Sequence, residues 1–329
     1  MIRNNKVVAL FISFLFAFPL SAYDRLTPGE YIPSLFEQRY SQPFVVQRLT
    51  ENSYVAMVSA HNATFYVGKK GVLLIDTTLA DTASGLVAAI HSVTSLPVTA
   101  VIYSHYHMDH VGGSNVIQSE FTVNGNNINF VATRAVAEHI ERYGNKIPSP
   151  NIIIESSGGD FEFEGVKVKL HVPRSGGGHS PDNTIIYLPE ERLLHYVDLL
   201  QPELLFPFFD LGISDILAAE ESLVTILDMD WDYVNGGHGN VGSKKDVKEL
   251  QGYLADLKAA VGNALESLSF AAHITQGPGD GVYTWIKNFD DALATQVKQA
   301  LSDKYGHIRN YDAVVGSHAV ALKSYFTLL

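Results

Sequence analysis

Four side chains that can bind metal lie within six residues of the sequence, in the stretch His105-Tyr106-His107-Met108-Asp109-His110. Neutral imidazole and carboxylate are the ligands that Zn²⁺ takes when thiolate is absent, and this chain has no cysteine. In an extended loop, alternation lets His105 and His107 face one metal while Asp109 and His110 point to a second. A solvated polar loop is the alternative, but it does not account for the spacing. The stretch therefore predicts a site for two metal ions.

Three more ligands are needed, because a catalytic zinc takes about three protein ligands and leaves a position for water. His179 follows the glycine-rich run 175–178, Asp198 follows an apolar run at 193–197, and His238 lies in the glycine-rich run 235–239. Each lies beside the end of an expected strand, where loop side chains gather into one site in layered folds. An ordinary carboxylate at a strand end is the alternative interpretation of Asp198.

The elements that position these residues follow from the spacing of apolar side chains. Runs rich in β-branched and aromatic residues predict antiparallel strands at 45–49, 53–59, 64–68 and 72–75, then a helix over 81–95 and a buried strand at 98–103. A second set follows, with a helix at 134–143, strands at 161–163, 166–172, 183–188 and 193–197, and a helix at 214–227. Two halves that each mix strands and helices predict a sandwich.

Residues 243–329 have a different pattern, with helical periodicity over 247–265, 289–305 and 311–326. The Gly-Pro-Gly-Asp-Gly of 277–281 is expected to break the first of these helices. Their apolar faces must be buried, either as a lid on the catalytic part or in a homodimer. The expected organisation is a signal peptide at 1–22, an N-terminal arm at 23–43, a catalytic domain at 44–242 and a helical region at 243–329.

The first 22 residues have the pattern of a cleavable signal peptide: Arg3 and Lys6 precede the apolar run 7–20, and Leu20-Ser21-Ala22 offers a cleavage site. A membrane anchor is the alternative, but the run is shorter than the roughly 20 residues that span a bilayer. We therefore expect a periplasmic or secreted protein with no membrane association after cleavage. Cleavage leaves 21 Lys plus Arg against 35 Asp plus Glu, a formal charge of −14. Such a surface excludes nucleic acid and leaves a small-molecule substrate.

Three motifs, HYHMDHVGG, GGGHSPDNTIIYLPEERLLHYVDLL and NGGHG, occur in this order, and they resemble the metallo-β-lactamase superfamily over about residues 45–242. The resemblance implies a four-layer αββα sandwich of mixed α and β structure, with the metals at one edge and the C-terminal helices outside it. It also implies that His105, His107 and His179 bind a first zinc, that Asp109, His110 and His238 bind a second, and that Asp198 bridges the two.

The residue at the bridging position separates branches of that family. The segment 178–188 is similar to zinc β-lactamases, but those enzymes usually carry cysteine where this chain has Asp198, whereas lactonases and glyoxalase II-like thioesterases use aspartate. We therefore expect hydroxide held between two zinc ions to attack a lactone, ester or thioester carbonyl, with Asp109 orienting it. A β-lactamase is the first alternative, and a zinc-dependent binding or scaffold protein is the second. The oxygen ligand also admits Mn or Fe.

Other polar residues near these motifs have two interpretations each. Asp76 ends a strand, and either orients a ligand imidazole or caps the following turn. His61 and Asn62 lie between two strands, where a solvated hairpin tip is favoured over contact with substrate. His171 and His195 occur inside strands and are interpreted as packed core histidines.

Overall fold

The computed structural model describes residues 23–122, 127–205 and 215–327. The predicted signal peptide lies outside these ranges, so export stays a prediction. Within the described ranges, no helix combines the length and the apolar character that crossing a membrane requires.

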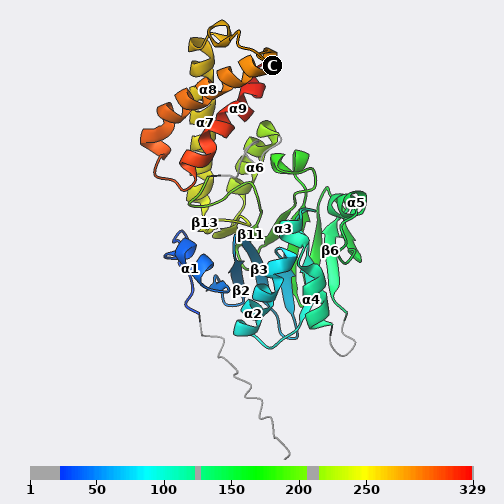
Figure 1. Cartoon of the computed structure of the whole chain (residues 1–329). Coiled ribbons are helices and arrows are strands. Elements are labelled where there is room, and N and C mark those ends of the chain that lie inside the picture. Colours follow the sequence, from blue (N-terminus) through cyan, green and yellow to red (C-terminus); the bar gives the residue numbers. More distant parts are fainter. Residues whose placement is uncertain (1–22, 123–126, 206–214, 328–329) are drawn as a thin grey trace, which may run out of the picture.

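The strands form two sheets (Figure 1). The first sheet contains, in spatial order, β1 (Val45–Arg48), β2 (Ser53–Val58), β3 (His61–Val67), β4 (Val72–Ile75), β5 (Val98–Ile102), β6 (Asn129–Thr133) and β7 (Ile152–Ile154). The second contains β13 (Val241–Gly242), β12 (Tyr233–Asn235), β11 (Leu193–His195), β10 (Ile185–Leu188), β9 (Val166–His171) and β8 (Gly159–Phe163). Strands β1 to β4 pair antiparallel, which confirms the prediction for residues 45–75.

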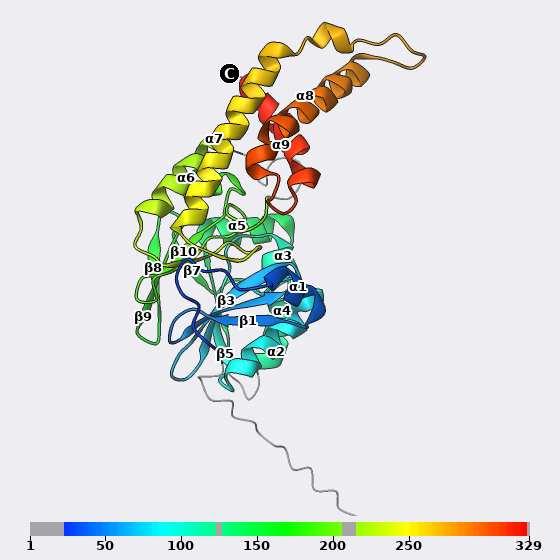
Figure 2. The same ribbon diagram turned by 90° about the vertical axis from the view of Figure 1, so that its left-hand side faces the viewer.

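The helices lie on the two outer faces of this pair of sheets and at the C-terminal end (Figures 1 and 2). They are α1 (Leu35–Ser41), α2 (Ala83–Val93), α3 (Met108–Val111), α4 (Ser114–Phe121), α5 (Arg134–Tyr143), α6 (Ile216–Asp228), α7 (Lys244–Ser267), α8 (Val282–Tyr305) and α9 (Tyr311–Thr327). The predicted helix at 134–143 has the predicted bounds. Helix α1 and strands β6 and β7 have no expected counterpart, because these short segments show too little periodicity.

Alternation along the strands produces the layers, because successive side chains point to opposite faces of a sheet. In β2, Tyr54 and Ala56 pack with α2, α4 and α5, whereas Val55 and Met57 pack between the two sheets. The second sheet buries its other face against α6 and α7. The αββα sandwich with a C-terminal helical part is therefore confirmed.

The C-terminal helices α7, α8 and α9 share one hydrophobic core with the second sheet, in which Leu194 and Val234 join Leu254, Val297 and Val315. Helix α7 makes the contact with α6 and β13, whereas α8 and α9 pack against α7 and against each other (Figures 1 and 2). The homodimer stays a prediction. The prediction that residues 277–281 break the first helix was wrong, because α7 already ends at Ser267. The glycine run instead precedes α8, which begins at 282 and not at 289 because Gly281 occupies its N-terminal cap.

Candidate metal centre

The His-rich stretch follows β5 at the edge of the first sheet. His105 lies in a bend after the strand, and His107 has extended backbone directly before α3, which has Asp109 in its first turn and His110 in its last. The change from strand to helix turns these side chains toward one point. A Cβ on Gly113, directly after α3, would lie 2.2 Å from the carbonyl oxygen of Thr77, so glycine permits the close packing that holds the loop under the sheet.

The other three candidates come from loops at the edge of the second sheet. His179 follows a short 3-10 turn, 174–178. Asp198 and His238 each lie three residues beyond a strand, β11 and β12, and these two strands are parallel. Because parallel strands end at the same edge of a sheet, both loops reach the same place.

All seven predicted side chains are brought together, in two overlapping groups whose ligand atoms lie within 4.8 Å of one another. One group contains His105, His107, His179 and Asp198, and the other contains Asp109, His110, Asp198 and His238. This division matches the one that the family resemblance implies, with Asp198 common to both groups. The assignment of each residue as a ligand stays a prediction.

Asp198 lies at the centre of this cluster. Its Oδ2 lies 3.1 Å from Nε2 of His179 and of His110, and its Oδ1 lies 3.1 Å from Nε2 of His238. Oδ2 is also 3.4 Å from Nε2 of His105. The carboxylate is 6 % exposed. A strand-end carboxylate without a role would be solvated, so this position favours the bridging interpretation over the alternative.

The donor atoms fit a metal better than they fit one another. Among the described residues, Nε2 of His105, Nε2 of His110 and Oδ1 of Asp198 are buried, and their short contacts within the cluster are ion-pair contacts that do not form hydrogen bonds. Leaving such atoms without a hydrogen bond costs about 1–3 kcal/mol each. Converging imidazole nitrogens and carboxylate oxygens are the donor set that divalent metals take in proteins. The cluster is therefore capable of binding metal ions.

Asp76 forms a hydrogen bond with His110, one of the seven candidate ligands, as predicted by the interpretation that it orients a ligand imidazole. Its Oδ2 accepts hydrogen bonds from Nδ1 of His110 at 3.1 Å, from Nε2 of His195 at 3.0 Å and from Oγ of Ser104 at 2.7 Å. Its Oδ1 accepts the backbone N–H of Ser104 at 2.9 Å. A carboxylate that accepts Nδ1–H leaves Nε2 of the same ring free to bind metal. Asp76 therefore fixes the orientation and the tautomer of His110.

His195 is a buried core histidine of β11, as interpreted, and both of its ring nitrogens have polar partners. The ring is fully buried, and its Nδ1 lies 3.0 Å from Oγ1 of Thr64 and its Nε2 bonds to Asp76. It belongs to a polar network under the metal cluster. A histidine inside an otherwise apolar strand was the signal for such a role.

The prediction that His61 and Asn62 lie at a solvated hairpin tip was wrong. Asn62 is 1 % exposed and donates from Nδ2 to the carbonyl oxygen of Gly239 at 3.1 Å. Nε2 of His61 lies 3.8 Å from Oδ2 of Asp109, and its ring packs edge-on against His238. The hairpin is tied down by the loop that carries His238, so His61 lies against the cluster.

The carboxylates of the cluster raise the pKa of two of its histidines, His110 and His238. Burial lowers the pKa of His105 to about 3 and that of His107 to about 4. Burial also acts against the charged form of His238, but the Asp198 carboxylate and its neighbours raise the pKa of that ring to about 9. The pKa of His110 is raised well above its ordinary value, since Asp198 outweighs burial there. In the metal-free protein, protons on these two rings take the place of a metal's positive charge.

A cleft of about 470 Å³ opens over the cluster and reaches His107, Asp109, His179, Asp198 and His238. Two segments that are far apart in the sequence, α1 and the start of α9, form part of its walls. Helix α1 contributes Phe36, Arg39 and Tyr40, and the start of α9 contributes Asn310, Ala313 and Val314. A ligand at the cluster would therefore contact the N-terminal arm and the helical region.

Arg39 connects the arm to the cluster. Its guanidinium is 3 % exposed and donates to the carbonyl oxygen of Ser59 and to Oδ1 of Asn62, the latter at 2.9 Å. These bonds hold α1 against the hairpin beside His61. No local pattern predicted this contact, because an arginine in a short helix is usually a solvated residue.

A family model described as the metallo-beta-lactamase superfamily matches residues 56–238. An (R)-specific secondary-alkylsulfatase of Pseudomonas sp. is 26 % identical over 183 residues, which cover 43 % of this chain and 27 % of the relative. A metallo-beta-lactamase type 2 of Bacillus cereus is 28 % identical over 126 residues, 38 % of this chain and 45 % of the relative.

Two solved structures extend the comparison. A stereoselective inverting sec-alkylsulfatase from Pseudomonas sp. has a TM-score of 0.62 at 19 % identity, over 93 % of this chain and 54 % of that one. A metallo-beta-lactamase from Pontibacter korlensis has a TM-score of 0.52 at 19 % identity, over 63 % of this chain and 99 % of that one. The chain thus spans about half the length of the alkylsulfatase structure it matches.

Proposed function

Because this chain belongs to the metallo-beta-lactamase superfamily of hydrolases, we propose that it holds two zinc ions and cleaves an ester, lactone or thioester. The observation that carries the proposal is Asp198, whose two carboxylate oxygens face histidines of both ligand groups. A purely structural zinc closes with four ligands and keeps no open position. Seven converging side chains below an open cleft therefore favour catalysis over a binding or scaffold role.

Zinc, when bound, supplies a Lewis acid for the substrate carbonyl and lowers the pKa of a shared water. His105, His107 and His179 would hold the ion on one side, and His110 and His238 the ion on the other. Overall, water oxygen bonds to the carbonyl carbon, the carbon–oxygen or carbon–sulfur bond breaks, and the proton of the water ends on the leaving group.

We assign to Asp109 the role of orienting the attacking water and accepting its proton. Its side chain is 33 % exposed toward the cleft, and its Oδ2 lies 3.5 Å from Nε2 of both His110 and His238. Burial acts to raise its pKa, but the hydrogen bond from His238 and the charge of His110 hold the pKa well below its usual range. It therefore stays ionised and able to orient the attacking water and accept its proton.

Sulfate esters are a second candidate substrate class. The alkylsulfatase structure matches the helical region as well as the sandwich, and here the start of α9 forms part of the cleft wall. The β-lactamase match leaves a third of the chain uncovered. This coverage supports a sulfate ester as an alternative substrate class, and the substrate panel below decides which bond is cleaved.

Metal removal and a substrate panel test the proposal. We expect chelation to abolish hydrolysis, zinc to restore it, and Asp109→Asn to lower kcat by at least about a hundredfold with the fold intact by circular dichroism. The panel contains a 4-nitrophenyl ester, a γ-lactone, an acyl thioester, an alkyl sulfate and a cephalosporin. Hydrolysis that persists without metal would refute the proposal. Preferred turnover of the alkyl sulfate would favour the second candidate, and preferred turnover of the cephalosporin would favour a β-lactamase.

A further inference from the structure

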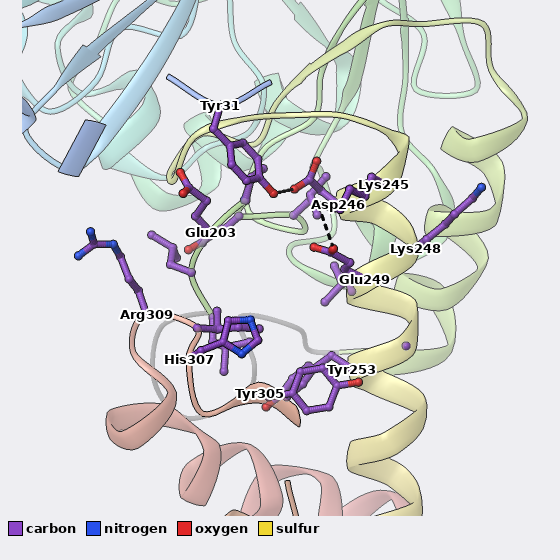
Figure 3. A pocket seen from close by; sticks show the side chains of 18 of the residues that line it. Tyr31, Glu203, Lys245, Asp246, Lys248, Glu249, Tyr253, Tyr305, His307 and Arg309 are labelled. Carbon is purple, nitrogen blue, oxygen red and sulfur yellow. Dashed lines mark hydrogen bonds and ion pairs between the residues drawn. The ribbon is translucent and has the colours of Figure 1, made fainter. Parts of the chain in front are cut away.

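A second and larger cavity, of about 900 Å³, adjoins the metal cleft. Figure 3 shows the side chains that line this cavity. It is enclosed by residues 200–205, the N-terminal half of α7 and the turn between α8 and α9. Its apolar lining is provided by Leu200, Leu205, Leu250, Tyr253, Tyr305 and Ile308. A cavity of this size with such a lining holds a ligand of several hundred daltons. We call it the large cavity.

The large cavity and the metal cleft adjoin. Gln201 and Leu204 line both of them, and the segment that contains these residues begins directly after Asp198. The segment is held on both sides, since Asn240 N–H donates to the carbonyl oxygen of Pro202 at 3.1 Å and Leu205 N–H donates to that of Arg309 at 3.1 Å. The segment 200–205 therefore forms a wall that the metal cleft and the large cavity have in common.

Most charged side chains of the large cavity have polar partners. Lys245 pairs with Glu249, and Asp246 accepts from Tyr31, within the lining; Lys304, Arg309 and Glu203 have partners outside it, Asp256, Glu37 and Asn240. A charge that already has a partner offers little to a charged ligand. Besides Gln201, Lys248 and His307, the lining consists mainly of leucine, isoleucine and tyrosine side chains, which favour a neutral apolar group.

We propose that the large cavity binds the aliphatic tail of the enzyme's own substrate, while the bond to be cleaved lies at the metal cluster. The inference rests on the proposed function and names its substrate class: an ester with a long alkyl or acyl chain. The tail passes beside Gln201 and Leu204 and ends between α7 and the α8–α9 turn. Each methylene that leaves water adds about fourfold to affinity, so specificity rises with chain length until the cavity is filled.

Gly252 allows the cavity to be filled by mutation. It lies in α7 on the wall of the large cavity, and a Cβ at this position would meet only Oη of Tyr305, at 3.9 Å. Gly252→Leu therefore adds a Cβ at ordinary contact distance from the cavity wall and extends a larger side chain from there, and it removes a glycine from a helix interior, which stabilises the helix. The matched control is Gly262→Leu in the same helix, where a Cβ would meet only the ring of Phe326, at 3.8 Å, outside the cavity.

Hydrolysis of 4-nitrophenyl esters from acetate to dodecanoate, and of hexyl and dodecyl sulfate, is the first measurement. We expect kcat/KM of the wild type to rise by about fourfold per methylene over several methylenes. Gly252→Leu should lose at least about tenfold on the longest substrates and less than about twofold on acetate. Gly262→Leu should match the wild type on all of them. An equal loss on short and long substrates, or no preference for chain length in the wild type, overturns the proposal.

Binding of a fluorescent probe, 11-(dansylamino)undecanoic acid, to the chelated protein is the second measurement. We expect Gly252→Leu to weaken binding by at least about tenfold and Gly262→Leu to leave it unchanged. Equal affinity of the wild type and Gly252→Leu overturns the proposal. Absence of hydrolysis for every substrate overturns the proposed function, whereas probe binding without metal still decides whether the large cavity takes an aliphatic chain.

Discussion

Asp76→Asn isolates the contribution of the carboxylate below the cluster, because it changes one atom and leaves the volume of the side chain the same. If the amide oxygen takes the place of Oδ2, the NH₂ group faces the backbone N–H of Ser104, which the native Oδ1 accepts at 2.9 Å. If it takes the place of Oδ1, the NH₂ group faces His110 and His195. In either orientation at least one charge-assisted hydrogen bond is lost.

The expected magnitude follows from that loss. A hydrogen bond to a charged group contributes about 1.5–3 kcal/mol, and the removal of a partner that orients a metal ligand typically lowers metal affinity by about 10- to 100-fold. We expect Asp76→Asn to weaken zinc binding within this range, measured by competition with a chromophoric chelator. Asp160→Asn, which removes an exposed carboxylate 3.1 Å from Lys167, is the control and should leave zinc affinity unchanged.

Asp76→Asn should also change the pH dependence of the free energy of unfolding of the metal-free protein. Burial acts to raise the pKa of Asp76, but hydrogen bonds from His110 and His195 hold the pKa below its usual range. A carboxylate with a lowered pKa contributes stability that is present above its unfolded pKa of about 3.9 and is lost as the pH falls. The wild type should therefore exceed Asp76→Asn in free energy of unfolding at pH 7, and the difference should narrow below about pH 4. Zinc affinity within threefold of the wild type would refute this account.

Two further outcomes follow from the geometry. Since the pKa of His238 is raised to about 9 and that of His110 is raised well above its ordinary value, zinc binding at pH 7 should release protons from the cluster, and fewer as the pH rises through about 9. Calorimetry in buffers of different ionisation enthalpy measures this release, and no release at pH 7 would contradict the reasoning. Gly177 has a φ of +66° and a Cβ there would lie 1.6 Å from Oη of Tyr196, so Gly177→Ala should lower the free energy of unfolding by about 2–4 kcal/mol. Gly144→Ala, at a φ of +67° in open space, should cost only about 1 kcal/mol, and equal losses in thermal unfolding would refute the steric argument.

The sequence was sufficient for the elements and residues whose signals are local. The strands of residues 45–75 alternate or are continuously apolar, and helices such as α5 and α7 carry long periodic stripes. The seven candidate ligands could be identified because histidine and aspartate beside glycine at a strand end is a rare local pattern. The two ligand groups required the family resemblance, since nothing in the spacing of His179 or His238 says which partner each one faces.

The walls of the cleft could not be predicted, because they depend on contacts between distant parts of the chain. Glu37 of the arm pairs with Arg309 at 3.1 Å, and neither residue stands out in its own segment. Arg39 and Asn62 meet across the arm and the hairpin for the same reason. Hydrophobic periodicity reports which face of an element is buried, but it carries no information about which other element covers that face.

Asp76 and Asp198 share a backbone conformation that is unusual outside glycine, with φ values of +64° and +66°. Aspartate and asparagine enter this left-handed region more readily than most other side chains, and β-branched residues enter it rarely, as Thr78 does here with a φ of +60°. The identity of residue 198 is therefore restricted by chain geometry before coordination chemistry is considered. Glycine would fit but brings no donor atom, and asparagine would fit but brings no negative charge. Aspartate meets both requirements at once.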